Sequence, residues 1–321
     1  MKVGVVGTGG MGNVHARQYR KMPGVQLGYY ERNQGRGESF RQNWEAQLCE
    51  SIDALLEWAD VIDICLPTDV HPEFAHKAIA ANKPLFLEKP IARSIAEAQA
   101  IVDAAASAKV PLMIGHVVRF FPEFALGRQM VLNGAVGKPA AIRTRRGGPT
   151  PKGSSGWFMD HARSGGVLLD LAIHDFDWLQ WTFGKVKFLY SRSLGAQTGK
   201  GPDYALTTLT FESGAVAHVE ATWMDPGGFR TYFDIAGSEG LLEFDTRKTP
   251  ALRTVTPESQ VLEPSVAPNE DPYYLELDAF LNSVRTGAPI PITGEDGMVA
   301  LRISIAALES AKTGKVVSLE R

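Results

Sequence analysis

Three glycines near the start of the chain, Gly7, Gly9 and Gly12, have the spacing GxGxxG. In this pattern the first glycine permits a tight turn, the second lets the backbone approach a pyrophosphate, and the third lets a helix pack closely on a strand. The glycines lie between a predicted strand at 3–6 and a predicted helix at 12–22, and this context favours a dinucleotide site over a turn that binds nothing. A pyrophosphate would meet the free N–H groups at the start of that helix. The residues expected at the cofactor here are Gly7, Thr8, Gly9, Met11 and Gly12.

An acidic residue, Glu31, follows the predicted second strand at 25–30 and stands 24 positions after Gly7. A carboxylate there can accept hydrogen bonds from both ribose hydroxyls, which favours NAD over NADP. The neighbouring Arg32 could instead pair with the 2′-phosphate of NADP, but Glu31 would repel that phosphate. The sequence therefore favours NAD and leaves NADP open.

Two further sets of residues could do acid–base chemistry. Asp170 and His174 are four residues apart on a predicted helix at 167–183, so both side chains project from one face. A carboxylate beside an imidazole fixes its tautomer and stabilises the imidazolium, which suits a general base. Lys89 follows a predicted strand at 84–87, at the edge where open α/β sheets bind ligands, and partial desolvation there disfavours its charged form.

Simpler readings of these residues are a surface Asp/His pair, half of a metal site, or a solvated lysine. No second cluster of histidine, cysteine or carboxylate residues accompanies Asp170 and His174 in the sequence. We therefore expect no metal.

The elements that must position these residues fall into two patterns. The first third of the chain alternates short apolar strands with amphipathic helices, which is typical of a parallel sheet with right-handed crossovers. From about residue 118, closely spaced alternating segments indicate a largely antiparallel sheet. We predict an α/β Rossmann domain at 1–118, followed by an α+β domain with an open, mostly antiparallel sheet at 119–321. The remaining predicted helices are 52–58, 72–81, 95–107, 123–132, 273–285 and 297–312, and the remaining strands are 61–66, 111–114, 140–145, 185–191, 205–211, 216–223, 230–235 and 241–244.

The overall composition excludes several classes of protein. The 33 basic and 36 acidic residues leave a net charge of -3, which gives no electrostatic reason to expect nucleic acid or an anionic membrane. The sequence has no apolar run of about 18 residues and no pattern typical of a secretory signal. Its two cysteines, Cys49 and Cys65, form no zinc-binding spacing. We expect a soluble, cytoplasmic protein with a small-molecule substrate and no nucleic-acid or membrane partner.

Three ordered motifs extend over nearly the whole chain. They are Asp60-Val-Ile-Asp-Ile-Cys-Leu-Pro-Thr68 leading to His71 and Glu88-Lys89-Pro90, then Gly115-His116-Val-Val-Arg119-Phe-Phe-Pro122, and finally Gly165-Gly166-Val-Leu-Leu-Asp170-Leu-Ala-Ile-His174 followed by Asp177. Together they resemble the Gfo/Idh/MocA family, which includes glucose–fructose oxidoreductase and inositol dehydrogenase. Ala172 departs from the family pattern, which usually has glycine there. Because alanine is the better helix former, we expect the local geometry to persist.

The resemblance implies a hydride-transfer reaction. His174 would take the proton of a substrate hydroxyl while a hydride passes from the same carbon to C4 of NAD. Lys89 would hydrogen-bond the reacting oxygen and share in the proton transfer, and Asp170 would hold His174 or another hydroxyl. The implied function is an NAD(P)-dependent dehydrogenase that oxidises a secondary alcohol of a sugar, cyclitol or derivative, or reduces the ketone.

Two other functions stay open. Some relatives use a bound NAD in a redox cycle for glycoside cleavage or sugar–sugar exchange. A regulator that senses sugar or NAD could have kept the fold without the chemistry, although Lys89, Asp170 and His174 together speak against this. In the family the outer face of the second sheet commonly forms subunit contacts, so we expect a homodimer or homotetramer.

Other residues have weaker claims to a ligand. Pro67, Thr68 and His71 follow a predicted strand and are expected at the cofactor with Glu88, although His71 could instead cap the next helix.

For the substrate we consider His116, Arg119, Trp157, Arg163 and Tyr232. The first two could equally pack at the domain junction, and the aromatic residues could stack on a sugar or belong to a core. Arg163, with the arginines at 143, 145 and 146, could clamp an acidic sugar, whereas a solvated strand face is the simpler explanation.

Overall fold

The computed structural model describes residues 1–151, 153–195, 199–201, 203–248, 252–256, 260–262 and 271–319. These residues form two compact units. The first consists mainly of Met1–Val117 together with α11 (Pro272–Thr286) and the beginning of α12 (Gly294–Thr313), and the second contains most of the remainder. The sequence predicted a single boundary after residue 118, whereas here α11, from the end of the chain, belongs to the first unit. The reason is that its Phe280 packs against Phe86 of the first sheet, with the ring centroids 5.7 Å apart.

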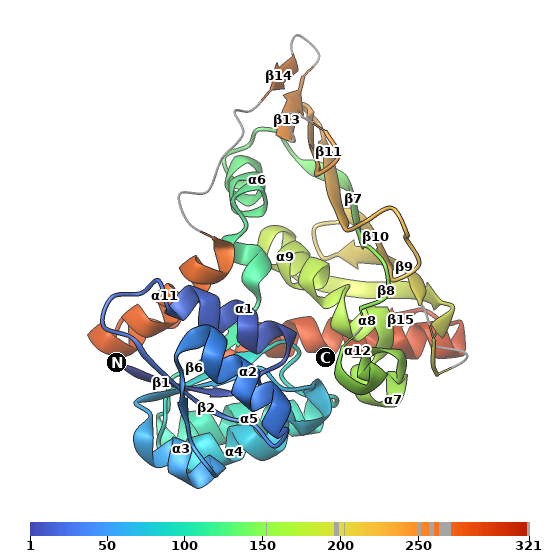
Figure 1. Ribbon diagram of the computed structural model, residues 1–321. Coiled ribbons are helices and arrows are strands. Elements are labelled where there is room, and N and C mark those ends of the chain that lie inside the picture. The colour runs from blue at the N-terminus through green and yellow to red at the C-terminus, as the bar shows by residue number, and fades with distance from the viewer. Residues whose placement is uncertain are drawn as a thin grey trace. The chain divides into compact units, whose positions relative to one another are not determined.

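The first unit is a parallel, six-stranded sheet in the order β3-β2-β1-β4-β5-β6. Strands β4, β5 and β6 are short, mostly apolar and buried along their whole length, as expected when helices cover both faces of the sheet (Figure 1). The strands are β1 (Lys2–Val6), β2 (Gln26–Tyr30), β3 (Gln47–Leu48), β4 (Val61–Ile64), β5 (Leu85–Glu88) and β6 (Leu112–Gly115), and the helices are α1 (Gly10–Tyr19), α2 (Gln34–Trp44), α3 (Ile52–Trp58), η1 (Thr68–Val70), α4 (His71–Ala80) and α5 (Ile95–Ala108).

Successive residues of β1 show how the two faces are covered. A Cβ on Gly4 would lie 3.0 Å from Leu55 of α3, whereas Val5 points to the opposite face, 3.6 Å from where a Cβ on Gly12 of α1 would be. Because all strands run parallel, the residues that follow β1, β2, β4 and β5 emerge at one edge of the sheet. The predicted Rossmann architecture is confirmed.

The sequence did not predict α2 or β3. Helix α2 buries only Gly37 and Phe40, so it lacks the apolar stripe that marks most helices of a globular protein. Strand β3 has two residues, both exposed, and gives no detectable alternation.

The second unit is built on a nine-stranded sheet in the order β14-β13-β12-β11-β7-β10-β9-β8-β15. Strands β7 and β10 pair in parallel and the other neighbours are antiparallel, which confirms the predicted open, mostly antiparallel sheet. The strands are β7 (Pro139–Gly147), β8 (Val186–Ser193), β9 (Tyr204–Phe211), β10 (Val216–Thr222), β11 (Arg230–Gly237), β12 (Leu241–Asp245), β13 (Leu252–Val255), β14 (Gln260–Leu262) and β15 (Val317–Ser318). The helices are η2 (Val117–Phe120), α6 (Pro122–Leu132), η3 (Ser154–Met159), α7 (His161–Ser164), α8 (Gly166–Asp170) and α9 (Ile173–Phe183).

One face of this sheet carries the core of the second unit. Phe124 of α6 and Trp178 of α9 pack on Phe233 and Phe244 of the sheet, with ring centroids 4.9–5.6 Å apart. Burying such rings is among the largest contributions that single side chains make to stability. Among the helices of the described residues, none is long and apolar enough to cross a membrane.

The third glycine of the turn provides a stability test of the first unit. A Cβ on Gly12 would lie 2.0 Å from the carbonyl oxygen of Gly7, a backbone atom that cannot move aside cheaply. We predict that Gly12→Ala lowers the free energy of unfolding by about 1–3 kcal/mol in urea titrations without cofactor. The matched control is Gly10→Ala, because no described atom lies within 4 Å of its Cβ position and alanine favours a helix. Equal stability of the two variants would contradict this packing.

Candidate active site

The glycine turn leaves open space beside the N-terminus of α1. Gly7 adopts a φ of 102°, and a Cβ there would lie 2.9 Å from the carbonyl oxygen of Cys65. Gly9 precedes the helix without a side-chain cap, and no described atom lies within 4 Å of its Cβ position. Asn13, which the sequence did not single out, donates to the carbonyls of Thr8 and Gly9 at 2.9 and 2.8 Å and so fixes the turn. The backbone therefore fits a pyrophosphate at the helix N-terminus.

The carboxylate of Glu31 is held beside this turn. Its Oε2 accepts a hydrogen bond from Thr8 Oγ1 at 2.8 Å, and its Oε1 accepts from the Asn33 N–H at 2.8 Å and Arg36 Nη2 at 3.0 Å. Burial tends to raise the pKa of Glu31, but the bonds from Arg36, Asn33 and Thr8 outweigh that effect and lower it. Glu31 is therefore ionised at neutral pH, in the position from which an acidic residue can accept ribose hydroxyls.

The side chain of Arg32 reaches residues of α4. Its side chain is exposed, with Nη2 3.7 Å from Glu73 and the guanidinium 5.7 Å from the ring centre of Phe74. The cation that contacts Glu31 is Arg36, which the sequence did not single out because α2 was not predicted.

His71 joins the segments that follow β4 and β5. Its ring is fully buried, with Nδ1 2.8 Å from the carbonyl oxygen of Pro90 and Nε2 2.8 Å from that of Leu66. The alternative that His71 caps a helix is wrong, because it is itself the first residue of α4 and its side chain makes no cap. Thr68, which lies close to His71 in the sequence, is buried, and Pro67 is half-buried.

Lys89 directly follows the last residue of β5. Its N–H donates to Glu88 Oε2 at 3.1 Å. The Glu88 carboxylate is buried against Gly115, where a Cβ would lie 3.2 Å from it. With His71 bonded to the next carbonyl, that of Pro90, the backbone at Lys89 is held on both sides.

Asp170 and His174 do not share one continuous helix. Helix α8 ends at Asp170. The N–H groups of Leu171 and Ala172 both donate hydrogen bonds to the carbonyl oxygen of Val167, at 3.1 and 2.7 Å. Helix α9 begins only after this turn, so the prediction of a single helix is wrong. No glycine or proline marks the break in the sequence, and the residues on both sides of it are buried. Asp170 is therefore a buried helix end, and His174 is half-buried in the first turn of α9.

Asp203, which the sequence did not single out, organises the start of α8. It accepts hydrogen bonds from the N–H of Val167 at 3.2 Å, from the N–H of Gly195 at 2.6 Å and from Ser193 Oγ at 2.9 Å. A Cβ on Gly166, whose φ is 66°, would lie 2.7 Å from its Oδ2. The glycine pair of the third motif therefore makes room for this buried carboxylate.

Arg119 forms a buried, bidentate ion pair with Asp177. The two bonds measure 2.8 and 2.6 Å, and the guanidinium lies 5.0 Å from the ring centre of Trp181. This arrangement favours a packing role for Arg119 over contact with the substrate. His116, in the first unit, is also buried.

The arginines of β7 do not form one clamp, because neighbouring residues of a strand face opposite ways. Arg143 and Arg145 lie on the outward face and pair with Asp234 at 3.0 Å and Glu220 at 2.9 Å. Arg146 faces the core and pairs with Asp175 of α9 at 2.7 Å. Arg163 belongs to α7.

Tyr232 lies on the outward face of the nine-stranded sheet, paired in register with Arg145, and its hydroxyl donates to Asp234. Burial, this bond and the charge of Asp234 raise the pKa of Tyr232, so the phenol stays neutral. Trp157 lies instead on η3, with its ring centre 4.1 Å from that of Phe158. The two aromatic residues thus belong to different parts of the second unit.

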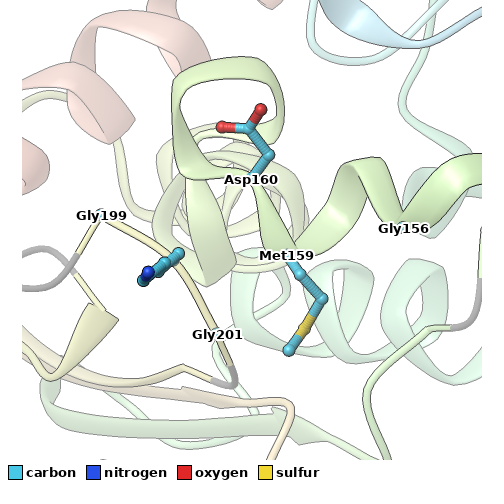
Figure 2. A pocket seen from close by; sticks show the side chains of 6 residues that line it. Gly156, Met159, Asp160, Gly199 and Gly201 are labelled. Atoms are coloured by element: carbon cyan, nitrogen blue, oxygen red, sulfur yellow. The ribbon is translucent and has the colours of Figure 1, made fainter.

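A cavity of about 750 Å³ lies within the second unit, close in sequence to Trp157 and Arg163. Figure 2 shows Gly199 and Gly201 on one side of it and Met159 and Asp160 on the other. Asp160 and Lys200 supply its charged groups. Its lining residues are Gly156, Met159, Asp160, Gly199, Lys200 and Gly201, none of which the sequence singled out.

Comparison with known families defines the class of protein. Residues 1–116 match an oxidoreductase family with an NAD-binding Rossmann fold, and residues 124–243 match the GFO/IDH/MocA C-terminal domain. The two matches cover well over half of the chain, and the chain belongs to the Gfo/Idh/MocA oxidoreductases. The predicted enzyme class and nicotinamide dinucleotide cofactor are thereby confirmed.

Individual relatives share the whole length of the chain. Myo-inositol 2-dehydrogenase of Thermotoga maritima is 29% identical, over 100% of this chain and 99% of its own. The scyllo-inositol 2-dehydrogenase (NAD(+)) of Bacillus subtilis is 27% identical, over 100% and 96%. Among solved structures, GenD2 from gentamicin A biosynthesis, in complex with NAD, has a TM-score of 0.89 at 22% identity and covers 100% of this chain and 97% of its own.

Proposed function

We propose that the protein is an NAD-dependent dehydrogenase that oxidises a secondary alcohol of a sugar or cyclitol, or reduces the corresponding ketone. The observation that carries this proposal is the ionised Glu31 carboxylate, bonded to Thr8 beside an open glycine turn. Lys89 follows a strand that ends at the same edge of the sheet. The similarity to two inositol dehydrogenases supports the substrate class. When bound, the cofactor supplies the hydride acceptor or donor.

His174 is the proposed proton acceptor for the substrate hydroxyl. It is the second residue of α9, so its imidazole lies in the first turn of a helix, where the positive end of the dipole disfavours the charged form. A neutral imidazole has a ring nitrogen that can accept a proton. The position therefore suits a base in the oxidation direction.

Lys89 is the proposed partner of the reacting oxygen. Its ammonium can donate hydrogen bonds to the oxygen on which negative charge develops during hydride transfer. Glu88 and His71 hold its backbone before substrate arrives, so little reorganisation is needed at that point. Asp170 has the proposed role of orienting His174 or a second substrate hydroxyl.

The charge around Glu31 favours NAD. A 2′-phosphate would bring negative charge toward an ionised carboxylate, which costs binding free energy. Arg36 is already bonded to Glu31, and Arg32 lies near Glu73. The Arg36 guanidinium is therefore not available to a 2′-phosphate without a rearrangement.

The outward face of the nine-stranded sheet supports a homo-oligomer. Phe188, Tyr190 and Leu206 are 37%, 37% and 44% exposed there. The ion pairs of Arg143 and Arg145 lie on the same face. We propose that this face packs against a second copy of the chain in a dimer or tetramer.

The cofactor preference should change when the Glu31 carboxylate is removed. We expect Glu31→Ala to shift the ratio of kcat/KM for NADP over NAD by about tenfold or more toward NADP, because hydrogen bonds to a charged group contribute about 1.5–3 kcal/mol. The matched control is Glu38→Ala, an exposed acid on α2 that pairs with Arg41. An unchanged ratio in Glu31→Ala, measured by reduction of both cofactors, would contradict the role of this carboxylate.

The proposed chemistry is tested by a screen of inositols, other polyols, sugars and uronates for reduction of NAD and NADP. Lys89→Met and His174→Ala should each lower kcat by about 10²–10⁴-fold and leave NAD affinity within a few-fold. Lys77→Met and His76→Ala, both on α4, are the matched controls and should retain activity. Substantial activity in either Lys89→Met or His174→Ala would overturn the assignment. Cleavage of glycosides by the protein without net reduction of NAD would also overturn the assignment.

The assembly proposal is tested by light scattering coupled to gel filtration. The wild-type chain should have the mass of a dimer or tetramer, and Leu206→Glu with Tyr190→Lys should reduce it, because charge on the outward face opposes its burial. A monomeric wild-type mass would refute the proposal.

A further inference from the structure

A buried histidine connects the dinucleotide-binding helix to the strands beside it. His15 lies on α1, three residues after Gly12, and its ring is fully buried. Nδ1 is 2.8 Å from Asp63 Oδ2 on β4, at hydrogen-bond distance. Nε2 is 3.1 Å from Glu88 Oε1 on β5, close enough for an ion pair but not aligned for a hydrogen bond. The imidazole thus lies between two carboxylates inside the first unit.

The other groups recorded beside the His15 ring are a thiol and two aromatic rings. The Cys65 sulfur is 3.2 Å from Nδ1, and the thiol donates to Asp63 Oδ1 at 3.3 Å. Phe86 meets the ring edge-on at 5.5 Å between centroids, and Tyr273 of α11 lies at 6.1 Å. Two further buried groups complete the surroundings, namely Tyr19 of α1 and Glu276 of α11.

The charges in this cluster follow from its burial. Burial lowers the pKa of His15, but the charge of the adjacent Asp63 carboxylate and its hydrogen bond oppose that effect, and the pKa lies well above its usual value. Burial also raises the pKa of the Cys65 thiol, so the sulfur keeps the hydrogen that it donates to Asp63. Burial and the charge of Asp63 likewise raise the pKa of Tyr19, which remains a neutral phenol. An imidazolium between the carboxylates is the arrangement that compensates them.

The cluster reaches the active site through Glu88. One oxygen of Glu88 faces His15, and the other accepts the N–H of Lys89 at 3.1 Å. The absence of a side chain at Gly115 leaves room for this carboxylate, since a Cβ there would lie 3.2 Å from Oε1. A chain of contacts therefore runs from α1 through His15 and Glu88 to the backbone of Lys89.

We propose that His15 is a positioning residue, which as an imidazolium bridges Asp63 and Glu88 and thereby fixes the backbone of Lys89. The importance of His15 for catalysis rests on the proposed role of Lys89. The charge of the His15 ring and its contacts with Asp63 and Glu88 are independent of that role. The same bridge links α1, which begins at the glycine turn, to β5, which ends just before Lys89. Cofactor site and reacting residue are thus joined by one buried charge.

A bound metal is the competing explanation, because His15, Asp63 and Cys65 place ligand atoms within 4.8 Å of one another. Zinc holds nitrogen and oxygen ligands at about 2.0–2.2 Å, which keeps tetrahedral ligand atoms more than about 3 Å apart. The 2.8 Å separation of His15 Nδ1 from Asp63 is instead that of a charge-assisted hydrogen bond. The geometry favours a proton at this position.

The direct test is nuclear magnetic resonance of the full chain labelled with ¹⁵N in histidine and lysine. We expect both ring nitrogens of His15 to be protonated at neutral pH, and the Lys89 amide to shift together with His15 when the ring titrates at alkaline pH. In Glu88→Gln the Lys89 amide should no longer follow that titration. A neutral His15 ring at pH 7, or a Lys89 amide that ignores it, would overturn the proposal, as would stoichiometric zinc in the purified protein.

A matched pair of variants separates positioning from general stability. His15→Gln keeps a hydrogen-bonding amide without the charge. It should lower kcat about 10–100-fold and leave NAD affinity within threefold of the wild-type value. The control His76→Gln, at an exposed site on α4, should leave both kcat and NAD affinity unchanged. The raised pKa stabilises the fold fully below about pH 6.5, and this contribution disappears as the pH rises through the folded-state value. The stability gap between wild type and His15→Gln should therefore close at alkaline pH.

The outcomes distinguish this proposal from the proposed function. If Lys89→Met retains activity, the role of Lys89 fails while the His15 charge is still decided by the resonance measurement. If Lys89→Met is inactive but His15→Gln has full activity and an unchanged pH profile, positioning by His15 is refuted. Should His15→Gln fail to fold, the wild-type titration of His15 and Lys89 decides alone.

Discussion

Parallel pairing in the first sheet is the constraint on which the rest of the site depends. The order β3-β2-β1-β4-β5-β6 makes the strands end at one edge, so segments far apart in the chain meet there without long loops. The glycine turn follows β1, Glu31 follows β2 and Lys89 follows β5. Each segment is then locked by a short polar contact: Thr8 to Glu31, His71 to the carbonyls of two segments, and Glu88 to the Lys89 N–H.

The second unit positions its own residue by different means. Helix α9, which carries His174, is tied by Asp175 to Arg146 of β7 and by Asp177 to Arg119 of η2. Both pairs are buried, and breaking one such pair typically costs about 3–5 kcal/mol because a charge is left uncompensated. Burial raises the pKa of Asp175, whereas the charge and the hydrogen bond of Arg146 oppose that rise. In both units, buried opposite charges therefore hold an element that carries one of the proposed reacting residues.

The sequence was sufficient for the architecture and for the glycine turn and carboxylate of the proposed cofactor site. Strand–helix alternation predicted the Rossmann sheet, and the glycine spacing with Glu31 predicted the open turn and its acidic neighbour. Local patterns could not reveal contacts between residues far apart in the chain. Asp203 supports Val167 from 36 positions away, and His15 meets Asp63 across 48 positions.

Other errors have local physical causes. The break between α8 and α9 contains neither glycine nor proline, so hydrophobic periodicity continues across it. Helix α2 was not predicted because it buries only two residues, Gly37 and Phe40, and so shows no apolar stripe in the sequence. Arg36, which lies on this helix, was therefore missed as well. Arg119 and Arg146 looked available for ligands because sequence does not show that an aspartate on α9 already pairs with each. A buried charge is recognised from its partner, and the partner is set by the tertiary fold.

The central claim is direct hydride transfer between a carbon that bears a hydroxyl and the nicotinamide. It is tested most directly with the polyol that the wild-type protein oxidises best, carrying deuterium on its reacting carbon. The account predicts that the deuterium appears at C4 of the reduced cofactor, on one face of the ring, and that the rate of a single turnover falls with the isotope. Reduced cofactor without deuterium, or deuterium released to the solvent, would contradict it.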